Sequence, residues 1–117
     1  MLKAGVFDDF KGATTLLLWG DRDGMEALFA SLSALRDTRG EFAIHGLIVC
    51  YTPEKSEGST LRMEGNDLRW FCSGDLLKLA AGLVEPLLDG AGHQFLDVDG
   101  LAEQVIIARD EYPADLR

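Results

Sequence analysis

The stretch GHQFLDVDG, residues 92–100, holds the side chains of this 117-residue chain that are best placed for metal or acid–base chemistry. It contains His93, one of two histidines, followed by Asp97 and Asp99. On a regular strand His93 and Asp97 share a face but lie roughly 13 Å apart, which is too far for a hydrogen bond. Asp97 and Asp99 lie roughly 7 Å apart and could share a metal only where a turn folds them together. The pattern favours a strand that enters a turn, with a metal site at Asp97 and Asp99 as the alternative.

A second candidate is WFCSGD, residues 70–75, where a strand is expected to run into a helix. The free N–H groups and the dipole of a helix N-terminus favour anions and lower the pKa of a thiol. Cys72 and Ser73, together with His93 or His45, could then form a small catalytic or ligand-binding site. Against this, Asp75 already places a carboxylate in the first helical turn.

The alternation of residues 68–72 also argues against an activated thiol. Cys72 is in phase with Leu68 and Trp70, which predicts that it points into the core. We therefore expect a buried Cys72 and a capping role for Ser73. His45 lies in phase with apolar strand residues and is expected to be a hydrogen-bonded core histidine.

Established catalytic and metal motifs are missing from the sequence. The motifs GxSxG, HExxH, GxGxxG and the phosphate loop do not occur, and the cysteines and histidines do not have zinc spacing. The calcium-loop fragments DRDG (21–24) and DVDG (97–100) lack the alternating ligands and the distal Glu of a calcium loop. The sequence therefore predicts no cofactor and favours a protein without enzymatic activity, while catalysis by residues distant in sequence stays open.

The charge balance limits the classes of partner. The chain has 20 acidic and 11 basic residues and a net charge of −9. Such a chain repels nucleic-acid phosphates and anionic membrane surfaces and attracts a basic protein partner, although solubility alone also explains the charge. Asp8 and Asp9 lie where a signal peptide would be basic and then apolar, and TTLLLW is too short to span a bilayer. The expected compartment is the cytoplasm, with both cysteines reduced.

Length and periodicity predict one domain over residues 1–117, without a recognisable internal repeat. A buried strand is expected at 13–20, followed by an amphipathic helix that opens with a capping box at Asp23 and Glu26 and ends at Gly40. Residues 41–54 are apolar on both faces, which predicts one central strand. A hairpin that turns at Gly65-Asn66 follows.

The second helix is expected to start at the Ser73 cap and to bend or end early at Pro86. Apolar residues cover two of its sides between Leu76 and Leu88, whereas one side is enough to cover a sheet. We therefore expect a homodimer, with an interface formed by Leu77, Ala81, Val84 and Leu88.

A last hairpin is expected from residues 93–98 and 103–110. A two-residue loop would place Leu96 opposite Glu103, whereas a four-residue loop places Leu96 opposite Val105 and Phe95 opposite Ile106. The second register pairs apolar residues on both faces and is preferred. The predicted fold is α+β, with a largely antiparallel sheet of about five to six strands and two helices in the order β-α-β-β-β-α-β-β.

Two segments resemble small bacterial immunity-type proteins of polymorphic toxin systems. LLLWGDRDGMEALFASLSAL (16–35) resembles their opening strand, Gly-Asp turn and Leu-rich helix, and HQFLDVDGLAEQVIIARDE (93–111) resembles their closing strands. The resemblance covers about a third of the chain and leaves residues 41–90 unmatched. It implies a non-catalytic binder of a toxin, in which Asp21, His93 and Asp97 are turn and strand residues of the fold.

Overall fold

The structure, a computed structural model, describes residues 1–53 and 58–116. Within these residues the chain forms nine strands, two α-helices and a short 3₁₀ helix. In chain order they are β1 (Leu2–Phe10), β2 (Ala13–Gly20), α1 (Arg22–Thr38), β3 (Glu41–Ile44), β4 (Leu47–Tyr51), β5 (Ser59–Glu64), β6 (Asp67–Cys72), α2 (Gly74–Val84), η1 (Glu85–Leu88), β7 (Gly92–Asp97), β8 (Asp99–Gly100) and β9 (Gln104–Arg109).

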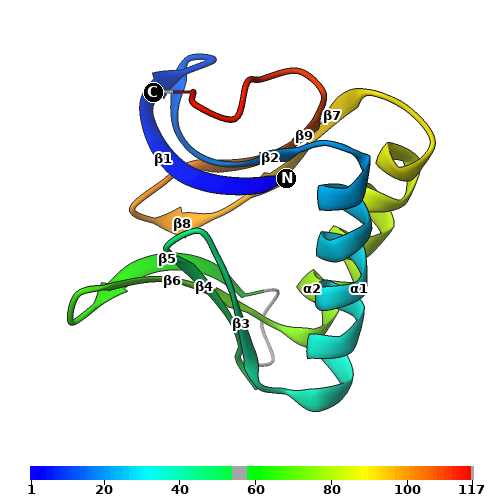
Figure 1. The fold of residues 1–117 in the computed structure, drawn as a ribbon. Coiled ribbons are helices and arrows are strands. Elements are labelled where there is room, and N and C mark those ends of the chain that lie inside the picture. The colour runs from blue at the N-terminus through cyan, green and yellow to red at the C-terminus, as the bar shows by residue number, and fades with distance from the viewer. Residues whose placement is uncertain (54–57, 117) are drawn as a thin grey trace.

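The strands form two sheets, one above the other, and both helices lie along one side of them (Figure 1). The four-stranded sheet has the order β1-β2-β9-β7, and the five-stranded sheet has the order β3-β4-β6-β5-β8. The predicted α+β class with two helices is confirmed. The arrangement differs from the predicted single sheet, because β2 runs parallel to β9, β4 to β6 and β5 to β8. Consecutive hairpins predict only the antiparallel contacts, whereas these parallel contacts join strands far apart in sequence.

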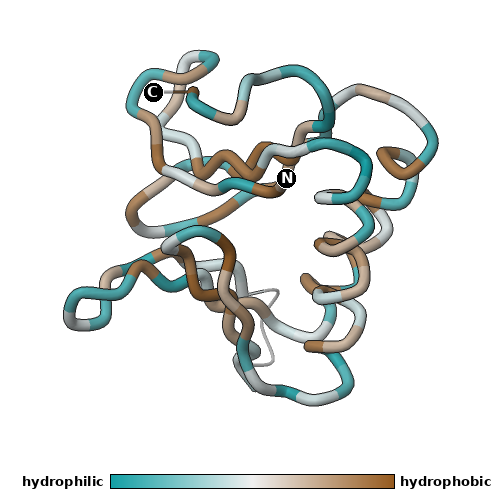
Figure 2. The backbone as a smooth tube through the Cα atoms, in the orientation of Figure 1, coloured by the Kyte–Doolittle hydropathy of each residue, from teal (hydrophilic) through white to brown (hydrophobic). Residues whose placement is uncertain are grey.

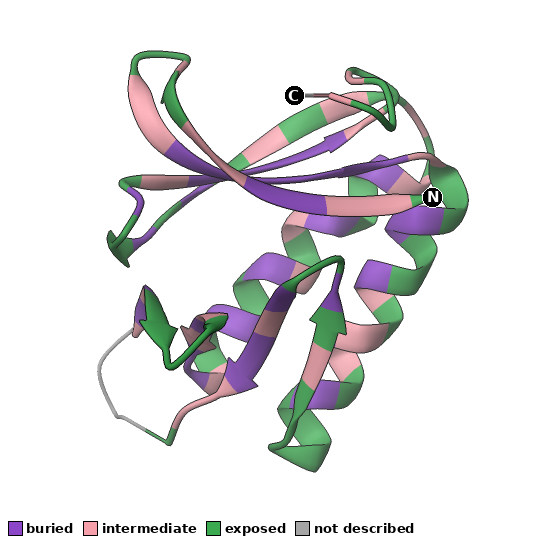
Figure 3. Ribbon diagram, turned by 60° about the vertical axis from the view of Figure 1, so that its left-hand side comes forward, coloured by how far each residue is buried: buried purple, intermediate pink, exposed green. Residues whose placement is uncertain are grey.

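Both sheets and both helices share one main hydrophobic core. The hydrophobic stretches of the helices turn toward the sheets (Figure 2). Exposed residues lie on the outer sides of the helices and at the ends of the hairpins (Figure 3). Trp70 and Leu61 of the five-stranded sheet and Leu16 of the four-stranded sheet are fully buried in this core.

Strand β1 is missing from the predicted order. It pairs antiparallel with β2, from Leu2 opposite Gly20 to Phe10 opposite Ala13. Asp8 and Asp9 interrupt the apolar alternation near its end, where the register shifts and Asp9 adopts a positive φ of 51°. The acidic pair that argues against a signal peptide thus belongs to the irregular end of an edge strand.

The predicted single strand over residues 41–54 is wrong, because the chain reverses within it. Strands β3 and β4 form a hairpin in which Ile44 pairs with Leu47. His45 and Gly46 form the turn with positive φ values of 42° and 90°, as a two-residue hairpin loop requires. His45 is therefore exposed and is not the predicted core histidine. Residue 54 of the predicted strand lies outside the described residues.

Two predicted hairpins are confirmed. Strands β5 and β6 pair around the turn at Gly65-Asn66, with Glu64 opposite Asp67. In the last hairpin Leu96 lies opposite Val105 and Phe95 opposite Ile106, which is the preferred register. In both hairpins the pairing of apolar residues on the buried face selects the register.

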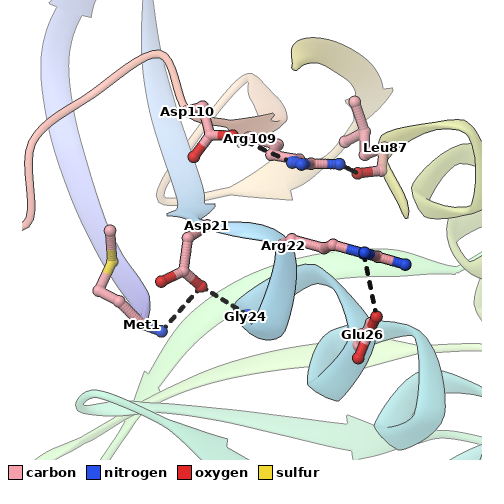
Figure 4. A network of polar contacts seen from close by, with 8 residues as sticks. All are labelled: Met1, Asp21, Arg22, Gly24, Glu26, Leu87, Arg109 and Asp110. Atoms are coloured by element: carbon pink, nitrogen blue, oxygen red, sulfur yellow. Dashed lines mark hydrogen bonds and ion pairs between the residues drawn. The ribbon is translucent and has the colours of Figure 1, made fainter. Parts of the chain in front are cut away.

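The ends of helix α1 differ from the prediction. The N-cap is Asp21, whose Oδ1 accepts hydrogen bonds from the Gly24 N–H and from the Met1 ammonium, both at 2.9 Å (Figure 4). Glu26 takes no part in a capping box, because its Oε1 pairs with Arg22 Nε at 3.2 Å. The left-handed residue at the C-terminus is Arg39, with φ 58°, and not Gly40.

Helix α2 begins and ends as predicted. The Ser73 Oγ accepts a hydrogen bond from the Leu76 N–H at 3.1 Å. The α-helix ends at Val84, and the chain continues as η1 through Leu88. Pro86 lacks an N–H and cannot continue the α-helical hydrogen bonding, which explains the change.

The chain consists of two halves with the same ββαββ topology, although no repeat is recognisable in the sequence. Strands β1 and β2, helix α1, and strands β3 and β4 form the first half; β5, β6, α2, β7 and β9 form the second. The halves exchange hairpins, so that the first hairpin of each half lies in one sheet with the last hairpin of the other. Two pairs of equivalent backbone hydrogen bonds support the match. The N–H of each helix cap donates to the chain at the start of its own half, Asp21 to Met1 O and Ser73 to Gly58 O. The residue after the last strand of each half donates to the end of a strand in the other half, Thr52 to Cys72 O and Asp110 to Gly20 O.

The two helices of the repeat bury equivalent positions. Ser73 lies 52 residues after Asp21, and the same spacing relates Leu96 in β7 to Ile44 in β3. Buried positions coincide at this spacing: Met25 with Leu77, Leu28 with Ala80, Leu32 with Val84, and Leu35 with Leu87. Because burial requires an apolar side chain and not a particular one, the repeat is preserved in the fold while the sequences of the halves differ.

Two of the four residues predicted to form a dimer interface are buried in the core. Leu77 is 1% exposed and Val84 is fully buried, whereas Ala81 and Leu88 are half-buried and pack against the same core. Leu77 and Val84 are covered within the chain, because α2 packs against α1 as well as against the sheets. The interface prediction is therefore wrong for Leu77 and Val84.

The exchange of hairpins makes each half dependent on the other. We expect the fragments 1–57 and 58–117, produced separately, to form a one-to-one complex on mixing. Trp19 and Trp70 become buried only in the complete sheets, so mixing should shift the tryptophan fluorescence to shorter wavelength and create a cooperative thermal transition in circular dichroism. Cooperative unfolding of either fragment as a monomer would contradict this expectation.

The ion pair at the start of α1 predicts a pH-dependent effect. The pKa of Asp21 lies below its ordinary value of 3.8. The larger cause is the hydrogen bond from the Met1 ammonium, and the smaller is the hydrogen bond from the Gly24 N–H. A lowered pKa contributes stability that is present above the ordinary pKa and is lost as the pH falls through the lower one. The variant Asp21→Asn keeps a capping oxygen but lacks the charge. Its melting temperature should lie below that of the wild type at pH 7, and the difference should shrink below pH ~4.

Candidate functional site

The cysteine of the predicted catalytic site is buried in the core. Cys72 is the last residue of β6 and has no exposed surface, and its Sγ lies 3.8 Å from the Trp70 carbonyl oxygen. Burial raises the pKa of the Cys72 thiol well above its usual range. The neighbouring Ser73 is 4% exposed and is occupied as the helix cap. Both residues therefore have the structural roles that the alternation and the cap position predict.

The two histidines lie away from Cys72. His45 is in the turn before β4, while Cys72 pairs with Tyr51 at the other end of that strand, which is roughly 13 Å from Leu47 along the strand. His93 is in β7 of the other sheet, and its Nδ1 lies 2.9 Å from Oε1 of Glu111. Its ring also contacts Phe95 edge to face at 5.2 Å. The predicted combination of Cys72 and Ser73 with a histidine is thus not assembled.

The two carboxylates of DVDG lie on strands of different sheets. Asp97 ends β7, and Asp99 belongs to β8, where it pairs with Thr60. Among residues 1–53 and 58–116, no group of three or more His, Cys, Asp or Glu side chains could hold a metal ion. The segment serves as the crossing from one sheet to the other, which is a turn role as the favoured interpretation predicts.

A cavity beside this segment lies between α2, β7 and β5. Its volume is about 290 Å³, and it is lined by Ser59, Asp75, Leu76, Leu79, Leu96 and Asp97. The Ser73 cap sets the start of α2 and so places Asp75 in the first helical turn, with Leu79 one turn later. The register of β7 on β9 places Leu96 and Asp97 at the opposite wall.

The cavity shares Asp75 and Leu79 with a shallow groove along the outer side of α2. The groove has a volume of about 510 Å³ and is lined by Asp75, Lys78, Leu79, Gly82 and Leu83. These positions follow the i, i+3, i+4, i+7, i+8 spacing of a single helix face. Leu79 is 55% exposed, and Gly82 has no side chain to fill the space beside it. We call this face the α2 stripe.

The equivalent face of α1 has a different composition. At the spacing of 52 residues, Leu79 corresponds to Ala27 and Leu83 to Ser31. Both helices hold the same place in the repeat, so the fold itself does not require large apolar residues at these positions. The exposed Leu79 of the α2 stripe therefore has no counterpart that would explain it as part of the fold.

Periodicity alone did not identify the α2 stripe as the free face. The sequence prediction places the interface on the side of Leu77 and Val84, which leaves Leu79 and Leu83 on the side that covers a sheet. The structure reverses these roles for Leu79. The available signal was Gly82 and Lys78 within the same stripe, since a glycine and a lysine are uncommon on a buried helix face.

The outer faces of the two sheets are occupied in different ways. On the four-stranded sheet, Trp19 is buried beneath the C-terminal segment, and its Nε1 donates to the Pro113 carbonyl at 2.8 Å. On the five-stranded sheet, Arg69 pairs with Glu41 at 3.3 Å, and Arg62 lies over the Phe71 ring at 4.2 Å. These aromatic and basic groups are engaged within the chain.

Comparison of the chain with protein-family models, with curated proteins and with solved structures found no significant match. Over residues 1–53 and 58–116, none of the helices has the length and apolar character needed to cross a bilayer.

The burial of Cys72 predicts a slow thiol reaction. Iodoacetamide should leave Cys72 unmodified in the folded protein at neutral pH, because the reactive thiolate is disfavoured and the sulfur is inaccessible. Peptide mass mapping with and without denaturant measures the difference, and modification should appear once the chain unfolds. Rapid alkylation of Cys72 in the folded protein at pH 7 would contradict this prediction and support a catalytic site at Cys72 and Ser73.

Proposed function

We propose that this protein is a non-enzymatic interaction protein that binds a basic protein partner through the α2 stripe. The observation that carries the proposal is the exposure of Leu79, at 55%, where it lines both an open groove and a cavity flanked by carboxylates. Apolar side chains at the centre and charged groups at the rim are the usual composition of a protein-binding surface. The resemblance to immunity-type proteins supports the same role and suggests a toxin as the partner.

The charge of the chain favours a basic partner over a second copy. Asp75 flanks both the groove and the cavity, and the whole chain carries a net charge of −9. Two copies of a chain with this net charge repel each other, whereas a basic protein is attracted to it. The homodimer is therefore the second occupant to be tested, and it would use the α2 stripe in place of the residues first predicted.

A matched pair of variants tests the proposal. Leu79→Glu places a charge in the α2 stripe, and Ala27→Glu places the same charge at the equivalent exposed position of α1. Immobilised wild-type and variant proteins would be used to capture partners from the source cells, together with sequencing of the neighbouring genes. The captured protein would then be purified and its affinity measured by calorimetry.

We expect a basic partner that binds the wild type and Ala27→Glu equally and Leu79→Glu at least about 30-fold more weakly, as for the loss of a central interface residue. The thermal stability of both variants should stay close to that of the wild type, because both positions are exposed. Equal affinity of all three proteins, or recovery of only a small metabolite, would contradict the proposal. Sedimentation equilibrium at micromolar concentration tests the homodimer. If the wild type is a dimer and Leu79→Glu is a monomer, the α2 stripe is occupied by a second copy of the chain and not by a basic partner.

A further inference from the structure

The cavity beside the α2 stripe is small. Its volume of about 290 Å³ lies just below the range for ligand pockets, roughly 300–1,000 Å³. Leu76, Leu79 and Leu96 form its apolar wall, and Asp75 and Asp97 supply carboxylates. A ligand that fits this lining has an aliphatic part and a cationic end.

The two carboxylates are not used elsewhere in the fold. Neither Asp75 nor Asp97 accepts a side-chain hydrogen bond or forms an ion pair within the described part of the chain. Lys78 lies one turn after Asp75 in the groove and forms no ion pair with it there. In the other half Asp21 holds the cap position that Ser73 holds in α2, and its carboxylate is paired with the Met1 ammonium at 2.9 Å. The carboxylates that line the cavity have no such cation from the described part of the chain.

A buried polar group also faces the cavity. Ser59 is 7% exposed, and its Oγ accepts a hydrogen bond from the Trp70 Nε1 at 2.9 Å. Among the residues that the structure describes, the Ser59 hydroxyl makes no further hydrogen bond, so one lone pair and its proton stay available to a ligand. The cavity thus combines a buried hydroxyl, two carboxylates and an apolar wall.

The same lining decides against an anion. The N-terminus of a helix attracts anions through its free N–H groups and dipole. In α2, however, the Ser73 Oγ already accepts from the Leu76 N–H, and Asp75 already supplies a negative charge. An anion in the cavity would face Asp75 and Asp97, whereas a guanidinium would be attracted by both.

We propose that the cavity between the first turns of α2, the end of β7 and the start of β5 is a socket for an arginine side chain of the partner. The aliphatic part of the arginine lies against Leu79 and Leu96, and its guanidinium lies beside Asp75 and Asp97. The planar guanidinium is weakly hydrated and carries five N–H donors, which suits a partly apolar site with several acceptors better than an ammonium does. This inference rests on the proposed function, because the socket receives a residue of the same partner that covers the α2 stripe.

The test uses a small probe and needs no identified partner. The wild-type protein would be titrated with Nα-acetyl-L-arginine N-methylamide at low salt and followed by ¹H–¹⁵N NMR. The corresponding citrulline derivative has nearly the same shape without the charge, and the lysine derivative has the charge without the planar group. We expect shifts confined to amides around the cavity, those of Asp75, Leu79 and Asp97 among them, with about tenfold weaker binding of the citrulline derivative.

Two double variants with the same change in net charge show whether the arginine probe is attracted by the carboxylates of the socket or by the acidic charge of the whole protein. Asp75→Asn with Asp97→Asn removes the carboxylates of the socket and should weaken the arginine probe about tenfold. Asp23→Asn with Asp89→Asn is the control, since Asp23 holds the position in α1 that Asp75 holds in α2, and it should leave binding unchanged. Equal weakening by both double variants, an equal response to citrulline, or shifts scattered over the acidic surface would each overturn the socket. Tighter binding of the lysine derivative would overturn the choice of arginine.

The outcomes for the socket and for the proposed function are distinguishable. If the captured partner loses affinity for Leu79→Glu but binds the Asp75→Asn, Asp97→Asn variant as tightly as the wild type, the function stands and the socket is wrong. If the arginine probe binds as expected but the cells contain no partner that depends on Leu79, the socket stands and the proposed function is wrong.

Discussion

The parallel contacts between the two halves are the interaction on which the rest of the structure depends. Strand β2 pairs with β9 from Thr15–Gln104 to Gly20–Arg109, and β4 pairs with β6 from Leu47–Leu68 to Tyr51–Cys72. Each of these central strands has an antiparallel neighbour from its own hairpin and a parallel neighbour from the other half. An isolated hairpin is only marginally stable in water, so neither half can complete a sheet alone. The parallel contacts convert four hairpins into two sheets around a shared core.

This architecture also explains why the two helices could diverge on their outer sides. The core requires the inner positions of both helices, such as Leu32 and Val84, to be apolar and buried. It places no such demand on the outer positions, where α1 has Ala27 and α2 has the exposed Leu79. The repeat therefore supplies an internal reference for each helix. A large apolar residue on one outer face alone points to a role other than folding.

The cavity gives the acidic charge a place on the molecule. An acidic chain attracts basic partners from a distance, but net charge does not select a binding site. The carboxylates of Asp75 and Asp97 do, because they line one cavity together with apolar side chains. Our functional proposal depends on this local combination of charge and apolar surface.

Several features could be predicted from the sequence because each depends on residues a few positions apart. The Ser73 cap, the hairpin at Gly65-Asn66, the early end of α2 at Pro86 and the burial of Cys72 all have this local origin. The register of Phe95 on Ile106 also follows from local alternation, because a shift by one residue would place apolar residues opposite polar ones. The same alternation misled at residues 41–51, since apolar residues on both faces are typical of a central strand as well as of this hairpin.

Only the tertiary structure decided the repeat, the parallel contacts and the free side of α2. The repeat preserves which positions are buried and not which residues occupy them, so burial had to be known before the halves could be matched. The parallel contact of β2 with β9 joins strands from opposite ends of the chain, and no nearby turn specifies it. A helix that is apolar on most of its sides gives no local signal for the side that remains open. That side is determined by the elements that pack against the helix, and here α1 and the sheets cover Leu77 and Val84 and leave Leu79 exposed.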